Sequence, residues 1–539
     1  MSNAPEAQGA IDGGLRRILP IAIIVAISAF AAYRGLAFET AAPGSRVLTH
    51  WDEASFLVRI QHSVLLETPL PGGYRYPSAM HQVGLACLLP DILKTGPGTV
   101  EKGRLVRSVF RDLSYRHRVR AVLIGLALLA IPWTYAFALQ RGASRAEALL
   151  AAALLGFSFE LGYHIRWIAS DPLLMQFGIL SALCLARARG SSSPDGWLGL
   201  AAAAAGFGCG SKYPGGLLLL PVLAAAILPR PGETRSLRRR LAFAAAAATI
   251  FALAFAAATP GCLWETDTFV RDVEFERNLY GNRGFFGYTV EPGIEPLGRI
   301  LIWIALSVFS PWAVPAAGIA ILVLIGLVAT IRRDRGQSLF LLGFPAVYIA
   351  FFCLQKVLVV RNFMIVLPFL AILAARGAQD LAETLPRRGR CLLAIALAAI
   401  LAANAAFLVQ AGESIRQRNP SGLPAALSRR IDRSPGVRFL VTPRLESDLA
   451  AEGRAPRANV GSDPLRPADV AAFYASDVPS LWLWTANRYG YVLDQIGPDD
   501  VNLDYYPSWF ASERIFLLGV RDALALGVFV LPIEALEKP

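Results

Sequence analysis

The sequence predicts an α-helical protein that crosses a membrane many times. Of its 539 residues, 55% are hydrophobic and only 17% are charged, whereas soluble domains carry about 25% charged residues. The mean hydropathy is +0.47, and long apolar runs separated by short polar segments recur between residues 18 and 410. These observations argue against a soluble enzyme, a disordered chain and a disulfide scaffold.

A membrane-spanning helix needs about 20 apolar residues, and about eleven runs approach that length. The predicted spans are 18–36, 119–139, 145–163, 170–187, 196–210, 213–229, 241–258, 311–331, 338–354, 362–376 and 391–410. Residues 29–31 also resemble a signal-peptide cleavage site, so a cleaved leader is the alternative for the first run. The many runs that follow favour an uncleaved anchor.

Arginine residues predict the orientation of the chain, because short cytoplasmic loops collect Lys and Arg. With the N-terminus inside, every second loop is basic. These inner loops contain Arg16 and Arg17, Arg141 and Arg145, Arg187 and Arg189, Arg230, Arg235 and Arg238 to Arg240, Arg332, Arg333 and Arg335, and Arg387, Arg388 and Arg390. We therefore expect a multi-pass protein of the cell (plasma or inner) membrane, with a cytoplasmic N-terminus and an extracytoplasmic C-terminal domain.

Two outer loops and the C-terminal region are expected outside the membrane. The first loop, 37–118, contains apolar residues at helical spacing over 54–67, which predicts a helix lying in the interface. The second, 260–297, is polar and rich in glycine, which suits either a mobile loop at a site or a solvated connector.

We divide the chain into a membrane domain, 1–410, and a small soluble α/β domain, 411–539. Apolar runs in the second domain predict strands at 437–441, 481–484, 515–518 and 528–531 and a helix at 468–474.

Charge and cysteine content exclude other classes of ligand. The formal net charge is +12, but the basic residues are spread over short loops, so no nucleic-acid partner is expected. The six cysteines occur singly, without a C-x-x-C pair. Since no His/Asp/Glu cluster has metal-ligand spacing either, we expect neither a metal nor another cofactor.

Acidic residues near the outer ends of the spans are the first candidates for chemistry. Asp52 and Glu53 are adjacent and follow the first span, where carboxylates cost free energy unless they face water, a partner or a site. The alternative is an ordinary N-terminal helix cap. Asp171 before Pro172 is most simply a helix start signal, and His81 in an apolar run is expected to be structural.

Cations at the outer turns are the second group of candidates. Lysine occurs at only five positions, yet Lys212 and Lys356 both lie at outer turns, with Arg361 close to the second. Snorkelling to lipid headgroups is the alternative, but arginine fills that role nearly everywhere else. Lys and Arg together suit a lipid phosphate; Arg166 is a weaker candidate, and Tyr76 offers a ring that stacks on sugars or lies at interfaces.

These motifs resemble the integral-membrane glycosyltransferases of the GT-C class, specifically the protein mannosyltransferase and aminoarabinose transferase group, glycosyltransferase family 39. The resemblance covers residues 15 to 410. It rests on five motifs in order, Asp52-Glu53, Tyr76-Pro77, Asp171-Pro172, Lys212-Tyr213-Pro214-Gly215, and Arg361 followed by Leu367-Pro368. Arg361-Asn362 stands where relatives often have an Arg-Tyr pair, and an acceptor-recognition motif is not found.

The resemblance implies a GT-C fold and transfer of a sugar from a polyprenyl-phosphate donor to a lipid, glycan or protein acceptor at the outer face. It implies that Asp52 is the general base and that Glu53 orients Asp52 or the donor. A phosphate leaving group departs as an anion and needs cations rather than a general acid, so one carboxylate suffices. Direct displacement at the anomeric carbon is expected, and it inverts the configuration. The predicted substrate and phosphate ligands are Lys212, Lys356, Arg361, Arg166, Asp171 and Tyr76.

Two functions from other classes remain alternatives. One is a transporter or flippase of lipid-linked saccharides, and the other is an inactive membrane scaffold with an exported binding domain. A transporter should carry ionisable groups near the midplane of broken spans. Here the spans have few charges in their middles, which favours an enzyme that works at one face.

Overall fold

The computed structural model describes most of the membrane region and short pieces of the C-terminal region. The described residues are 18–33, 51–94, 103, 105–106, 108–109, 113–165, 167–191, 193–229, 235–284, 289–333, 335–417, 431–433, 439–441, 460–461, 470–474, 494–496 and 528–532.

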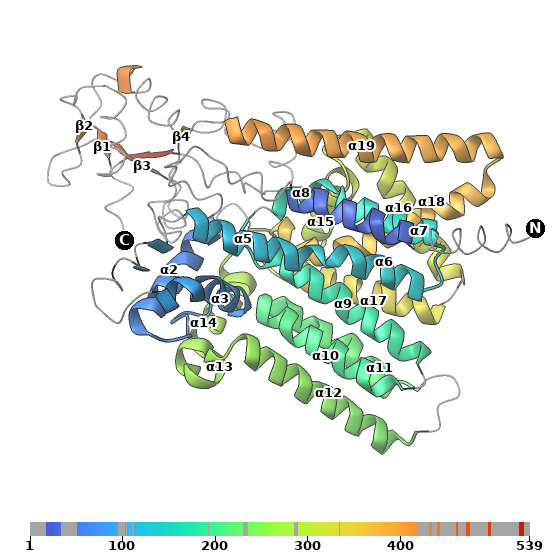
Figure 1. Ribbon diagram of the computed structural model, residues 1–539, viewed down its shortest axis with the longest axis horizontal. Helices are drawn as coiled ribbons and strands as arrows, with labels where there is room; N and C mark the ends of the chain where they lie inside the picture. The colour runs from blue at the N-terminus through green and yellow to red at the C-terminus, as the bar shows by residue number, and fades with distance from the viewer. Residues whose placement is uncertain are drawn as a thin grey trace, which may run out of the picture.

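Helices account for nearly all of the described membrane region (Figure 1). Its first half contains Ile18–Tyr33, α2 (Trp51–Leu66), α3 (Ala79–Lys94), α5 (Leu113–Leu128), α6 (Ala130–Gln140), α7 (Arg145–Gly156), α8 (Phe159–His164), α9 (Asp171–Gly190), α10 (Pro194–Ser211), η1 (Tyr213–Leu218) and α11 (Leu219–Ile227). Its second half contains α12 (Leu237–Ala258), α13 (Gly261–Trp264), α14 (Thr266–Asn278), η2 (Leu279–Arg283), α15 (Ile294–Leu306), α16 (Ala313–Arg333), α17 (Arg335–Cys353), η3 (Val360–Val366), α18 (Leu367–Thr384) and α19 (Arg387–Gln417).

The predicted α-helical membrane protein is confirmed. Six helical segments of the described chain are long and apolar enough to cross a membrane, namely Ser114–Gln140, Asp171–Gly190, Leu237–Ala258, Ala313–Arg333, Val360–Thr384 and Arg387–Val409. Shorter apolar helices cover Ile18–Tyr33, Tyr213–Ile227 and Leu341–Cys353. The total of eleven spans and the orientation of the termini stay predictions.

One predicted span differs from the structure. The run 145–163 is not a single helix, because α7 ends at Gly156 and α8 begins after Ser158. The Ser158 hydroxyl accepts a hydrogen bond from the Leu161 amide (3.2 Å), which makes it an N-cap that starts a new helix. The break lies inside an apolar run, where hydropathy alone gives no sign of it.

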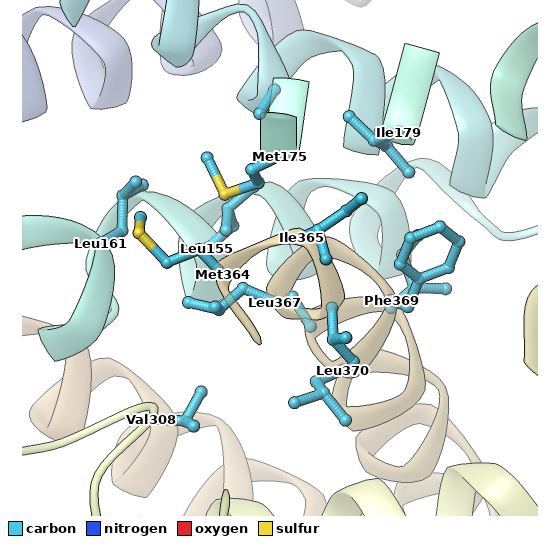
Figure 2. Packing of buried hydrophobic residues seen from close by; sticks show 14 of the residues in the cluster. Leu155, Leu161, Met175, Ile179, Val308, Met364, Ile365, Leu367, Phe369 and Leu370 are labelled. Atoms are coloured by element: carbon cyan, nitrogen blue, oxygen red, sulfur yellow. The ribbon is translucent and has the colours of Figure 1, made fainter. Parts of the chain in front are cut away.

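The core of the bundle forms around η3 and α18. Met364, Ile365 and Leu367 pack with side chains from α7, α8 and α9, as Figure 2 shows. On the other side, α16 approaches α18 closely at two glycines: a Cβ on Gly326 would lie 1.8 Å from the Leu373 carbonyl oxygen. Small residues allow helix backbones to pack closely in a membrane, where apolar burial between helices drives little association.

The described strands of the C-terminal region form a five-stranded sheet in the order β2-β1-β3-β5-β4. The strands are β1 (Phe439–Val441), β2 (Val460–Gly461), β3 (Val470–Tyr474), β4 (Asp494–Ile496) and β5 (Val528–Pro532). β1 pairs in parallel with β2 and β3, whereas β5 pairs antiparallel with β3 and β4.

The sheet bears out two of the predicted strands and corrects the predicted helix. The strands at 437–441 and 528–531 are confirmed as β1 and β5. The helix at 468–474 is wrong, because its apolar run forms β3, which is paired on both sides; so short a run has no period that separates strand from helix. The strands at 481–484 and 515–518 lie outside the described residues. The division at 410 stays a prediction, and α19 continues past it to Gln417.

Candidate active site

Helices from the two predicted outer loops lie together at one end of the bundle (Figure 1). They are α2 and α3 from the first loop and α13 and α14 from the second. The predicted interfacial helix over 54–67 is present as α2. Its buried stripe consists of Glu53, Phe56, Leu57, Ile60, Ser63 and Val64, which follow the helical repeat, so one face of α2 packs on the protein.

Glu53 is the charged member of this stripe. Arg120 in α5 donates through Nη2 to Oε1 of Glu53 (2.6 Å), with side-chain exposures of 2% and 0%. The Ile168 amide donates to the same oxygen (3.1 Å). Glu53 therefore ties α2 to α5 and to the segment before α9. Asp52 lies in the first turn of α2, and its side chain is outside the described part of the structure.

Arg120 is a residue that sequence reasoning missed. It lies at the second position of the predicted span 119–139, where a charged side chain is costly without a partner. That cost is the signal that could have identified it. The many arginines near span ends concealed this signal, because most of them fit an anchoring role.

A second buried polar cluster joins three predicted residues that are far apart in the sequence. The Lys212 ammonium donates to Asp171 Oδ1 (2.5 Å) and to Asn362 Oδ1 (2.6 Å). Arg361 Nε lies 3.7 Å from the other carboxylate oxygen of Asp171. All four side chains are buried. Among the three ionised groups, the cations outnumber the carboxylates by one.

Local sequence explains how the cluster forms. Asp171 and Pro172 occupy the first turn of α9, where an acid is favoured by the helix dipole and proline loses no hydrogen bond. Lys212 follows α10, where Pro214 ends the regular helix and η1 begins. A Cβ on Gly215 would lie 2.5 Å from the backbone carbon of Gly208, so glycine lets η1 fold back against α10.

A pocket lies next to this cluster. It is lined by Ser55, Phe56, Arg59, Tyr76, Pro77, Met80, His81, Ala169 and Ser170. Tyr76 connects the pocket to the cluster, since Lys212 Nζ lies 5.9 Å from the centroid of its ring. Ser170 directly precedes Asp171. The structure thus places Tyr76 beside Lys212 and in the same pocket as Ser170.

His81 is a neutral structural group in the pocket wall. The Ser63 hydroxyl donates to the Leu70 carbonyl (2.8 Å) and lies 3.0 Å from His81 Nε2, so the ring donates its Nε2 proton to the serine oxygen. Burial lowers the pKa of His81 to about 3, and the positive charge of Arg59 acts in the same direction. This environment agrees with the structural role expected from the sequence.

The two remaining predicted cations are Lys356 and Arg166, and the structure describes only the first. Lys356 is half-buried before η3, and its backbone bonds to the Tyr280 carbonyl (2.6 Å) and the Val290 amide (2.9 Å). In the described part of the chain, its side chain forms no ion pair with a carboxylate. Arg166 lies outside the described residues. The phosphate-binding roles of both stay predictions.

The fold defines a multi-pass membrane protein with buried charged groups near the junction of its outer-loop helices. Within it, residues 113–259 match the model of the family described as dolichyl-phosphate-mannose-protein mannosyltransferase. This match confirms the predicted resemblance to that family of membrane glycosyltransferases, and the matched segment contains Arg120, Asp171 and Lys212. The match supports glycosyl or related transfer as the activity of the chain.

Solved structures of two kinds resemble the chain at low sequence identity. ArnT from Cupriavidus metallidurans in the apo state is 14% identical, with a TM-score of 0.48, over 97% of this chain and 98% of that chain. The archaeal oligosaccharyltransferase AglB from Archaeoglobus fulgidus, in complex with an inhibitory peptide and a dolichol-phosphate, is 9% identical, with a TM-score of 0.49, over 90% of this chain and 74% of that chain. A search of curated proteins returns no match.

Proposed function

We propose that the protein transfers a sugar from a polyprenyl-phosphate donor to an acceptor hydroxyl group, with inversion at the anomeric carbon. The observation that carries the proposal is the meeting of Asp171, Lys212 and Arg361 beside a pocket bordered by α2, the helix on which Asp52 lies. The donor class is that named in the description of the matching family.

Asp52 is the proposed general base. Helix positions 52, 55 and 59 follow one face, because three or four residues make one turn, and Ser55 and Arg59 line the pocket. Position 52 is therefore one turn before the pocket residues. In the reaction, the carboxylate takes the acceptor proton, the acceptor oxygen bonds to the anomeric carbon, and the bond to the phosphate breaks with its electrons leaving on the phosphate.

The buried cations are proposed to stabilise that departing phosphate. Its negative charge increases in the transition state, so a fixed positive charge binds the transition state more strongly than the donor. Lys212 and Arg361 supply this charge, held in place by Asp171. Lys356 is proposed as a further ligand at the edge of the site. Asp171 acts here by positioning the cations, since its carboxylate is already occupied by Lys212.

The test is release of free polyprenyl phosphate by the purified protein in lipid, with polyprenyl-phosphate mannose, glucose and aminoarabinose as donors. We expect Asp52→Asn to lower turnover by roughly 10²–10⁴-fold with an unchanged unfolding midpoint. Asp267→Asn, which alters an exposed carboxylate of α14, is the matched control and should behave as the parent. Parental turnover in Asp52→Asn would show that another group is the base.

The same assay separates this proposal from the two alternatives. A folded parent that releases phosphate from no donor, even with a mixture of lipid and peptide acceptors, contradicts glycosyl transfer. That result would instead favour transport of the lipid-linked saccharide or a scaffold role.

A further inference from the structure

Residues 74–78 form one wall of the pocket. This segment is hydrogen-bonded at one end to the second outer loop and at the other end to the end of α12. Tyr76 and Pro77, in the middle of this segment, line the pocket. At one end, Tyr74 has a fully buried side chain. At the other end, the Ser78 amide donates to the Thr259 hydroxyl at the end of α12 (3.1 Å). The position of the Tyr76 ring therefore depends on contacts made by its neighbours.

Tyr74 uses each of its polar groups in these contacts. Its amide donates to Asp272 Oδ2 in α14 (2.7 Å), and its hydroxyl donates to the carboxylate of Glu265, the residue before α14. Its carbonyl accepts a hydrogen bond from the Tyr213 hydroxyl (2.5 Å). Because Tyr213 follows Lys212 directly, Tyr74 joins the second outer loop to the segment that carries the buried lysine.

Packing also holds the Tyr74 ring in place. The ring contacts Phe269 of α14 edge-on, with centroids 5.8 Å apart. A Cβ on Gly261 would lie 1.8 Å from the Tyr74 hydroxyl oxygen, so the ring rests on the bare backbone of α13. Burial, followed by the hydrogen bond to Glu265, raises the pKa of Tyr74, and the hydroxyl stays a donor at neutral pH.

We infer that Tyr74 is a positioning residue through which the second outer loop fixes the Tyr76 side of the substrate pocket. Glu265 and Asp272 hold Tyr74, and Tyr74 in turn keeps the Tyr76 ring next to Lys212. This inference rests on the proposed function in one respect, namely that the pocket binds substrate. Under this inference, the loop 260–297 is a part of the site rather than a solvated connector.

The first experiment needs no activity. Hydrogen exchange of the peptide that covers residues 72–80 is measured in the full-length protein in lipid. We expect Asp272→Ala and Tyr74→Phe to speed exchange by about tenfold, since each removes a hydrogen bond that involves a carboxylate. Asp272→Asn keeps an acceptor oxygen and should restore slow exchange, and Glu274→Gln, on an exposed position of α14, should match the parent. Parental exchange in both Asp272→Ala and Tyr74→Phe would overturn the inference.

The second experiment distinguishes positioning from simple loss of folding. In Tyr74→Phe with a parental unfolding midpoint, we expect KM for polyprenyl-phosphate mannose, or whichever donor the parent uses, to rise about tenfold and kcat to change less than twofold. An unchanged KM, or a fall in kcat alone, would overturn the positioning role. If the parent itself uses no donor, the proposed function fails, and the exchange experiment still decides whether the loop holds this wall.

Discussion

Replacing Arg120 by methionine tests the buried ion pair that anchors α2. The substitution keeps most of the apolar volume but removes the Arg120 guanidinium from the Glu53 carboxylate. Because both groups are at most 2% exposed and lie 2.6 Å apart, breaking this buried pair should cost about 3–5 kcal/mol of unfolding free energy. The Ile168 amide still donates to Glu53, which favours the lower end of that range, about 3 kcal/mol.

The assay is unfolding of the purified protein in mixed detergent and SDS micelles. Arg118→Met is a matched control on the same helix, because its ion pair with Asp91 is 39% and 31% exposed and exposed pairs contribute about 0–1 kcal/mol. The double variant Arg120→Met/Glu53→Gln should be more stable than Arg120→Met alone, since it also removes the buried carboxylate charge. Equal costs for Arg120→Met and Arg118→Met would refute this account of the pair.

Further predictions concern the second cluster, the helix contact and the buried histidine. Lys212→Met should destabilise the protein by removing the nearer of the two cations that contact the buried Asp171 carboxylate, and Lys212→Met/Asp171→Asn should recover part of the loss in the same unfolding assay. In Gly377→Ala, the new Cβ would lie 1.9 Å from a carbonyl oxygen of α16, so the free energy of unfolding should fall by about 1–3 kcal/mol. In Gly318→Ala, the new Cβ has nothing within 4 Å, so the free energy of unfolding should change by less than about 0.5 kcal/mol. The lowered pKa of His81 means that the unfolded chain binds a proton that the folded protein does not, so stability should fall by about 1.4 kcal/mol per pH unit below about 6.5. His81→Gln should flatten this decline in unfolding measured between pH 7 and pH 5; an equally steep decline would show that other groups cause it.

Length and hydropathy were enough to predict the membrane fold, because a bilayer demands long helices and the sequence supplies the matching apolar runs. Hydropathy did not predict the places where a single polar side chain breaks a helix, or where a short apolar run can form either a helix or a strand. Ser158 ends one helix and begins another inside an apolar run. Residues 470–474 form a strand, although their composition suits a helix equally well.

The site was predictable in its members but not in their connections. Lys212 stood out because lysine is rare in this chain, whereas Asp171 became a candidate only through the family resemblance, since Asp before Pro is most simply a helix start signal. Their ion pair joins residues 41 positions apart, and the bond from Lys212 to Asn362 spans 150 positions. Nothing local encodes contacts of that range. Tyr74 could not be identified from the sequence, since its importance comes from partners in a loop almost 200 residues away.

The adjacent acids of α2 occupy different positions around the helix. Successive positions of a helix are about 100° apart, so positions 52 and 53 face different directions. Glu53 belongs to the buried stripe with Leu57 and Ile60, where its charge is neutralised by Arg120. Position 52 belongs instead to the turn that leads to Ser55 and Arg59, which line the pocket. The ion pair of Glu53 with Arg120 therefore fixes the rotation of α2 about its axis, and the proposed role of Asp52 depends on that rotation.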